Sequence, residues 1–575
     1  MLRHRAPAAV ALLALALPGC QTDRGMPTAD ELAAMVAEAE EPPLDHSGPR
    51  VELGESGPAR FVRRLYNGFR EARAMDTVVH LDARSRAPGS EGYDESFDHI
   101  EAALRAQGFG DRPDLLLEVQ EHDRGRPAWN PRSGELRLLT GAGGEAVLHA
   151  FDDPAGVDRC LLPENAPGCD VEGPVSLGID SLAPGDVLLT EAALRPDLLV
   201  RARSAGAAAV ISCSLESYNE DPTGRERHRD AIQFRRLSGE VPLPVAQISP
   251  RSYDQVRAAA EGGEARLHLR ARVDAGPTTV RTLVATVVGV GRPEEAVVLS
   301  THLEAPGAND NASGAAGQLE AALTLVRVVD AGGISAPDRS LVFLWGPEND
   351  QVDHWLDRTE RRVVAAVSTV MIGESQEETG AVPLLERAPD PGATDTLAPD
   401  EHTLWGARPV EAGWLRPNGL SIIARCALVD VSEQVGGWAT HENPYEGGTD
   451  HERFLARGVP AVLFWHFTDF TFHTSLDRVG MVDGSELRRG AVAALVTAMA
   501  LADPAPSDLT RYLRSLDRER DLRVGAAEEA GRPEVAERWR HWASGARQWF
   551  RVLCLDLPAE QAWLPGPLDE ERGTE

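Results

Sequence analysis

Lysine is absent from this sequence. All 58 basic residues are arginine, and 90 acidic residues outnumber them, which gives a net charge of −32. Without lysine the chain has no phosphate-loop lysine, no Schiff-base lysine and no Ser–Lys dyad. The negative charge also argues against a nucleic-acid partner, because phosphate binding requires a positive field. Carboxylates and histidines remain to carry the chemistry.

Cysteine and aromatic residues are scarce. Six cysteines in 575 residues do not make a disulfide framework, and aromatic residues form 5% of the chain. Cys160 and Cys169 would either pair in an oxidising compartment or remain free thiols. Cys213 and Cys426 have no paired histidine signature, so we expect them in the core. Ser313 and Ser375 lack a G-x-S-x-G elbow, which argues against serine-hydrolase chemistry.

The N-terminus has the pattern of an export signal. Arg3, His4 and Arg5 precede the apolar run AAVALLALALPGC, which is too short to span a membrane. Its end, LPGC, resembles a bacterial lipobox. We therefore predict a lipoprotein signal peptide at 1–20, with Cys20 as the lipidated first residue of the mature protein in the cell envelope. Plain secretion to the periplasm or medium is the alternative, and a buried N-terminal helix is another.

No later stretch reaches about 18 unbroken apolar residues, so the lipid anchor is the one membrane contact we expect. Residues 21–54 are polar and read as a tether. The ranges 55–134 and 278–503 carry helical and strand patterns, whereas 135–277 contains short β-like runs. Residues 504–575 are rich in charged residues and have the pattern of helices. We predict one domain in two parts, a β-rich insert and a helical C-terminal extension.

The strand-like runs after residue 278 are apolar throughout, as in EAVVLST and SLVFLWG. Strands of this kind are typical of a sheet that is covered on both faces. The predicted fold class is therefore α/β, with a mostly parallel mixed sheet between two layers of helices. The run GDVLLTEAALRPDLLVRARSAGAAAVI resembles the core of a protease-associated domain, which makes the insert a module of that type.

Polar residues follow several of these runs. His302, Glu304 and Asp310 follow the first, Glu348 and Glu374 follow the next two, and Asp469 and His473 follow the last. Ligands collect beyond the carboxyl ends of strands in open α/β sheets, and imidazoles with carboxylates suit zinc. Alternatively, Asp310 caps a helix, and Glu348 is a surface loop residue.

Five phrases together resemble the metal-site signature of metallopeptidase family 28, which comprises zinc aminopeptidases and carboxypeptidases. They are THLEAPGANDNASGAAGQLEAA, FLWGPEN, VMIGESQEETGAVPLLER, GGTDHERFLARGVPAVLF and FHTSLD. The resemblance implies a zinc-exopeptidase-like fold and a peptide substrate. It implies that His302 binds one metal, Asp310 bridges two and His473 binds the second. Glu348 would be the general base, and Glu304 would orient His302.

The chain departs from the family pattern at three positions. Glu304 stands where an aspartate is usual, Asn349 replaces one carboxylate ligand, and Val370 replaces another. The site could hold two zinc ions, a single zinc on His302, Asp310 and His473, or none. Glu374 and Asp350 are possible substitute ligands. Asp450 and His451 belong either to the substrate cleft or to the loop's own structure.

The predicted function is that of a metal-dependent exopeptidase, of aminopeptidase type, on the cell envelope. The alternative is a catalytically degenerate, peptidase-like binding or scaffold protein. Another hydrolase or acyl-transfer reaction on the same fold is a third reading, since fold does not fix function. The sequence leaves trimming from either end of a peptide open.

Overall fold

The computed structural model describes residues 56–555 apart from 142, 153–155, 157, 240 and 264. Cys20, the expected signal peptide and the expected tether lie outside the described residues, so they stay predictions. In the described part of the chain, no helix has the length and apolar character needed to cross a membrane.

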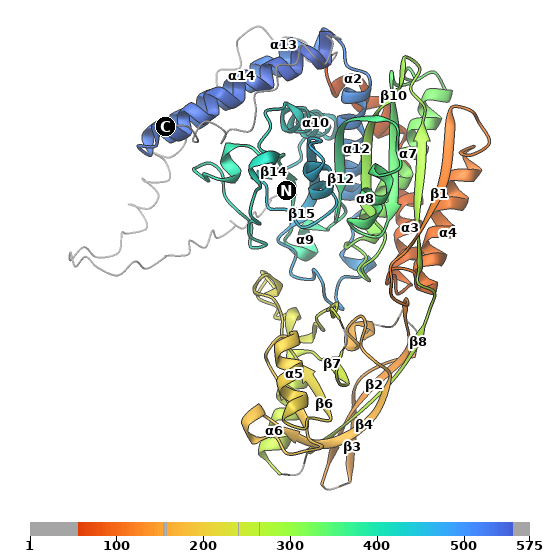
Figure 1. Ribbon diagram of the computed structural model, residues 1–575, viewed down its shortest axis with the longest axis vertical. Helices are drawn as coiled ribbons and strands as arrows, with labels where there is room; N and C mark the ends of the chain where they lie inside the picture. The colour runs from red at the N-terminus through yellow and green to blue at the C-terminus, as the bar shows by residue number, and fades with distance from the viewer. Residues whose placement is uncertain are drawn as a thin grey trace, which may run out of the picture. The chain divides into compact units, whose positions relative to one another are not determined.

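The first sheet has eight strands in the order β1-β9-β11-β10-β12-β15-β13-β14 (Figure 1). β10 is parallel to β11 and β12, and β12 is parallel to β15, so these four strands end at one edge. The strands are β1 (Leu115–Asp123), β9 (Thr279–Val287), β11 (Arg339–Gly346), β10 (Arg292–His302), β12 (Arg362–Thr369), β15 (Ala461–Phe467), β13 (Val382–Glu386) and β14 (His441–Asn443).

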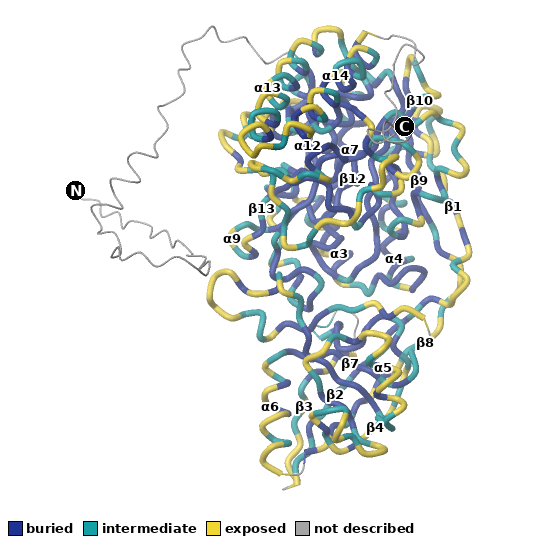
Figure 2. The backbone as a smooth tube through the Cα atoms, turned by 60° about the vertical axis from the view of Figure 1, so that its left-hand side comes forward, coloured by how far each residue is buried: buried dark blue, intermediate teal, exposed yellow. Residues whose placement is uncertain are grey.

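Helices cover both faces of this sheet. Along β10, Val297 and Leu299 join one core while Ala296 and Val298 join another, because successive side chains point to opposite faces. One face packs on α2 (Ala59–Gly68), α3 (Glu71–Asp82), α4 (Glu91–Ala106), α7 (Ala312–Asp330), α10 (Leu420–Val435) and α12 (Gly484–Ala502). The other packs on α8 (Asp350–Leu356) and α11 (His451–Ala456). The predicted α/β fold class is confirmed, and Figure 2 shows α7 and most of the central strand β12 as buried.

Residues 129–275 form a second, seven-stranded sheet in the order β3-β2-β8-β4-β5-β6-β7. The chain leaves the first sheet after β1 and returns as β9, which pairs with β1 through Asp123 and Thr279. Cys160 and Cys169 are both free in this insert. Its elements are β2 (Trp129–Thr140), β3 (Gly144–Phe151), β4 (Cys169–Ser176), β5 (Val187–Thr190), β6 (Ala209–Ser212), β7 (Val245–Gln247), β8 (Ala265–Ala275), α5 (Pro196–Ser204) and α6 (Pro250–Glu261).

The chain continues beyond α12 as two long helices, α13 (Asp508–Glu529) and α14 (Pro533–Leu555). Trp539 and Trp542 of α14 are buried against Ala527 of α13. Arg523 of α13 lies 2.7 Å from Asp400, which also binds the buried Arg387. The helices are thus fixed to the loop after β13. The short helix α9 (Gln376–Thr379) completes the set of α-helices among the described residues.

Candidate active site

The site is built around Asp310, a buried carboxylate in the loop that joins β10 to α7. His302 is the last residue of β10, and its Nε2 lies 3.5 Å from Asp310 Oδ1. His473 approaches the other oxygen, with its Nε2 at 2.9 Å from Asp310 Oδ2. Glu348 Oε1 lies 3.9 Å from His302 Nε2. The four residues selected from the sequence are therefore neighbours, although they come from three different strand ends.

The Asp310 loop is held by groups that the sequence did not single out. Asp477 accepts hydrogen bonds from the backbone N–H groups of Asn309 and Asp310, at 2.7 and 2.9 Å. A Cβ at Gly307 would lie 1.8 Å from Asp477 Oδ2, so this approach requires glycine. Asn311 donates to the His302 carbonyl and accepts from the Met371 N–H. Asp477 lies four residues after His473, in the phrase FHTSLD, and this proximity in the sequence was the one feature that could have drawn attention to it.

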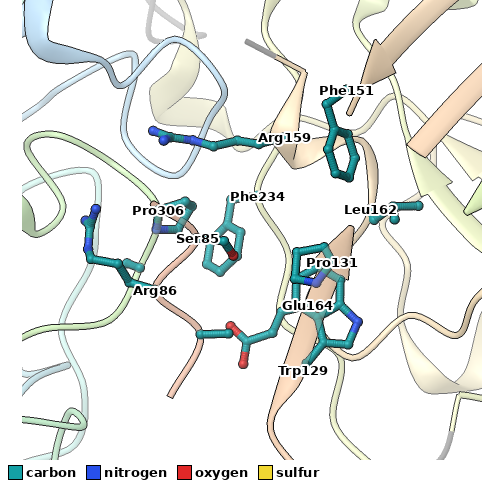
Figure 3. Close-up of a pocket in the computed structure, with 12 residues that line it drawn as sticks. Ser85, Arg86, Trp129, Pro131, Phe151, Arg159, Leu162, Glu164, Phe234 and Pro306 are labelled. Atoms are coloured by element: carbon teal, nitrogen blue, oxygen red, sulfur yellow. The ribbon is translucent and has the colours of Figure 1, made fainter. Parts of the chain in front are cut away.

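Arg86 supports the same loop from the segment between α3 and α4. Its side chain is 1% exposed, and it donates to the carbonyls of Leu303 at 3.0 Å and Gly307 at 2.7 Å. Figure 3 shows Arg86 and Pro306 among the residues that line a small cavity of about 20 Å³. The sequence showed this segment as an ordinary loop, because no local pattern reveals a contact more than two hundred residues away.

Two buried carboxylates position the loop that carries Glu348. Glu304 Oε1 accepts from the Glu348 N–H at 2.8 Å. Asp450 accepts from the Asn349 N–H at 2.7 Å and from Gln351 Nε2 at 2.6 Å. Of the two roles considered for Asp450, these hydrogen bonds support the one in which it stabilises the loops themselves. His451 is also structural, because its Nε2 lies 2.8 Å from Glu386 in the core.

The geometry at Glu304 differs from the role implied by the family resemblance. Its carboxylate Oε2 lies 3.9 Å from His302 Nδ1, which is beyond hydrogen-bond distance. The ring nitrogen instead contacts the backbone oxygen of Glu304 at 3.2 Å. The longer side chain, one methylene beyond aspartate, reaches past the imidazole to the Glu348 backbone.

Burial and charge shift the pKa values in opposite directions here. Burial alone would lower the pKa of His302, but Glu348, Asp310 and the other carboxylates raise it above its usual value. Burial raises the pKa of Glu304 to about 7 and that of Asp450 to about 6. Burial also opposes ionisation of Asp310, yet its contact with His473 brings the pKa below its ordinary value. Asp310 is therefore an anion that both imidazoles stabilise.

The possible substitute ligands have other surroundings. Glu374 is fully buried, with Oε2 at 3.5 Å from His466 Nδ1, and Asp350 is exposed at the start of α8. Asp469 accepts from the N–H and hydroxyl of Thr471, which closes a local turn. Val370 belongs to a buried apolar cluster with Trp465 and Phe472. In this arrangement neither Glu374 nor Asp350 joins the site residues as a substitute ligand.

The insert holds the loop that carries His473. Asn219 donates to the carbonyls of Phe470 and Phe472, both at 2.9 Å. Gln233 Nε2 and the Phe234 N–H both donate to the His473 carbonyl, at 2.7 and 2.6 Å. His473 has a positive φ of 56°, which is uncommon outside glycine, and these donors fix that conformation. The insert is thus part of the site.

A cavity of about 320 Å³ opens on these residues. Its lining includes His302, Asp310, Glu348 and His473 together with an apolar wall. The insert contributes Phe234, Arg235 and Arg236. Phe234 lines the small cavity of Figure 3 as well, beside Glu164 and Trp129. The volume falls at the lower end of the roughly 300–1,000 Å³ that is usual for small-ligand sites.

The donors around Asp310 suit zinc in kind. Two imidazole nitrogens and a carboxylate are typical zinc ligands, and His302, Asp310 and His473 supply them. Val370 is apolar and Asn349 is an amide, at two positions where the family resemblance implies carboxylate ligands. Both imidazoles contact Asp310 directly, and no three His, Cys, Asp or Glu side chains within the described ranges are arranged around a common metal position.

The fold and the grouping at the strand ends define the class: an α/β protein with an exopeptidase-like site at the carboxyl edge of its sheet. Residues 282–350 match Peptidase family M28. This range contains His302, Asp310 and Glu348, so the match falls on the segment that carries three of the four site residues, and the resemblance seen in the sequence is confirmed there. No curated protein matches the chain.

One solved structure of an M28 peptidase precursor shares the fold, and two aminopeptidase structures are similar to a lesser degree. A peptidase M28 precursor from Shewanella amazonensis is 17% identical, with a TM-score of 0.51 over 77% of this chain and 96% of its own. A zinc aminopeptidase from Bacillus subtilis is 16% identical, with a TM-score of 0.48 over 75% and 94%. An aminopeptidase from Aneurinibacillus is 17% identical, with a TM-score of 0.46 over 76% and 95%.

Proposed function

We propose that this chain is a metal-dependent exopeptidase that hydrolyses short peptides. The observation that carries the proposal is the approach of two imidazole Nε2 atoms to the two oxygens of the buried Asp310, with Glu348 beside them at the cavity. His302, Asp310 and His473 would hold one metal ion. When bound, zinc supplies Lewis acidity at the scissile carbonyl and makes water more acidic.

Glu348 is the general base in this proposal. Its side chain is 25% exposed, the most of the three carboxylate residues that line the cavity, so it can meet both water and substrate. It accepts the proton from the attacking water and passes it to the leaving amine. Glu304 and Asp450 fix its position through the backbone of residues 348 and 349. These contacts place the base before the substrate arrives.

The test combines metal content with hydrolysis by the purified mature chain. We expect one zinc per chain and release of leucine from Leu-Leu that a chelator abolishes. Glu348→Gln should lower kcat by roughly 10²–10⁴-fold, the usual range for loss of a general base. Glu360→Gln is the matched control, because Glu360 is exposed in the loop after α8. Activity that resists both the chelator and Glu348→Gln contradicts the proposal.

A non-catalytic binding protein of the envelope is the second candidate. It is favoured by Val370 and Asn349 at two positions where the family has carboxylate ligands, and by the contacts among the remaining donors. Purified chain without metal and without hydrolysis of any peptide would support it. Stoichiometric zinc together with turnover would exclude it.

We also propose export and lipid anchoring through Cys20. The support is the basic start, the apolar run and the LPGC sequence at residues 1–20. The expected result is that the mature chain co-sediments with membranes and is labelled by a fatty acid, whereas Cys20→Ala loses the label. Equal labelling of both proteins would overturn the anchor.

A further inference from the structure

Three arginines line the substrate cavity of a chain whose net charge is −32. They are Arg235 and Arg236 from the insert and Arg408 from the loop before α10. Each has one acidic partner: Glu216 at 2.6 Å, Glu164 at 3.1 Å and Glu452 at 3.4 Å. A guanidinium carries five donors, so these single contacts leave donors for a ligand.

Arg236 is the arginine best placed to meet a substrate. Its Nε faces Glu164, and no other carboxylate of the described residues lies within ion-pair distance of it. The side chain is 34% exposed and is part of the cavity lining, so it is open to a ligand. Burial lowers the pKa of Arg236, but Glu164, Glu304 and Glu348 together raise it, so it lies within the field of the catalytic base.

The acidic residues of the cavity offer less to a substrate ammonium group. Glu304 and Asp310 are 2% and 3% exposed, and both already contact groups of the site. Glu348 is left as the accessible carboxylate, and it acts as the base. The cavity therefore presents more free positive charge than free negative charge.

Another part of the lining is apolar. Val370, Leu463, Trp465 and Phe472 form one buried cluster, and Trp405 packs edge-on against Phe472 with ring centroids 5.8 Å apart. All five residues line the cavity. The valine that replaces a carboxylate ligand of the family is thus part of a surface suited to an aliphatic or aromatic side chain.

We infer that the cavity selects a short peptide with an apolar residue and a free α-carboxylate, and that Arg236 binds this carboxylate. A guanidinium binds a carboxylate through two parallel N–H···O bonds, which fixes both position and orientation. The inference rests on the proposed function, which it sharpens from exopeptidases in general to enzymes for dipeptides and other very short peptides. The insert then contributes to specificity as well as to structure.

The experiment compares Leu-Leu with Leu-Leu-amide, which differ in the terminal charge. For the wild-type chain we expect kcat/KM to be about 10–100-fold higher for the free acid, the range given by one charge-assisted contact. Arg236→Gln should remove this ratio, chiefly by raising KM for Leu-Leu. Arg236→Lys should restore part of the ratio. Arg225→Gln is the matched control, since Arg225 is exposed in the insert and contacts Thr223.

Binding measured without turnover separates the two proposals. Calorimetry on Glu348→Gln should show tighter binding of Leu-Leu than of its amide, and the double variant with Arg236→Gln should lose the difference. If no peptide is hydrolysed but this difference is present, the proposed function fails and the inference stands. If both peptides are hydrolysed equally and Arg236→Gln changes neither, the inference is overturned while the proposed function stands.

Discussion

Replacement of Arg86 by methionine should destabilise the fold and displace the Asp310 loop. Methionine keeps most of the side-chain stem and removes the guanidinium. That group donates to the carbonyls of Leu303 and Gly307 in the loop and to that of Leu81 at the end of α3. Burial lowers the pKa of Arg86 to about 10, so it is charged at neutral pH, and Asp82, Asp310 and Asp477 lie within its field.

The magnitude follows from two opposing contributions. A hydrogen bond from a charged donor contributes about 1.5–3 kcal/mol net, so three contribute roughly 5–9 kcal/mol. Burial of the guanidinium costs several kcal/mol, and that cost disappears with the group. Loss of the cation also removes a donor from three carbonyls and a positive charge from the field of the neighbouring carboxylates. The expected decrease in the free energy of unfolding is about 3–5 kcal/mol, as for other broken buried charge contacts.

Urea unfolding followed by tryptophan fluorescence measures this decrease. The matched control is Arg84→Met, two residues earlier, whose ion pair with the exposed Glu95 should contribute at most about 1 kcal/mol. Arg86→Lys should recover part of the loss, because lysine keeps the charge but not the fork of donors. An Arg86→Met chain within 1 kcal/mol of the wild type, or equal to Arg84→Met, would refute the reasoning.

Three further outcomes are expected. Burial and the stacked ring of His354 at 3.7 Å lower the pKa of His122 to about 4, so the unfolded chain takes up the proton first as pH falls. Stability should therefore be lost between pH 6.5 and 4, by up to about 2–3 kcal/mol, and His122→Phe should flatten that part of a urea-midpoint profile. Val370→Asp puts a carboxylate into an apolar cluster, so the variant should have a lower melting temperature than the wild type in the presence of a chelator. Zinc should restore that melting temperature, because the new carboxylate would bind the metal. If zinc has no effect on the variant, position 370 is not next to a metal site. Gln233→Ala removes a donor to the His473 carbonyl and should lower kcat/KM about tenfold while changing the free energy of unfolding by about 1–2 kcal/mol; unchanged kinetics would show that the insert does not position His473.

The fold class and the site's main residues were accessible from the sequence because both depend on local patterns. Apolar runs of strand length indicate a sheet buried on both faces, and residues directly after such runs must gather at one edge when the strands are parallel. His302, Glu348 and His473 follow β10, β11 and β15 in this way. The free state of Cys160 and Cys169 was open, since pairing depends on distances that spacing does not give.

The supports of the site were not accessible, because they depend on contacts between distant segments. Arg86 lies more than two hundred residues before the loop it holds, and Asn219 and Gln233 reach the His473 loop from a different sheet. The role of Asp450 was undecided until its hydrogen bonds to Asn349 and Gln351 were seen. Side chains of this kind carry no periodic signal, since each makes one specific contact.

The sequence thus determined which reactive side chains this protein has, and the tertiary structure determined which groups surround them. A chain whose basic residues are all arginine, with carboxylates and histidines after its strands, has the residue types for metal or acid–base chemistry, and it lacks a carboxylate at residues 349 and 370. Only folding placed Val370 in an apolar wall and Arg236 in the lining of the same cavity. Residue types determine which reactions are possible, whereas the placement of charge and apolar surface around a cavity determines which molecule can enter it.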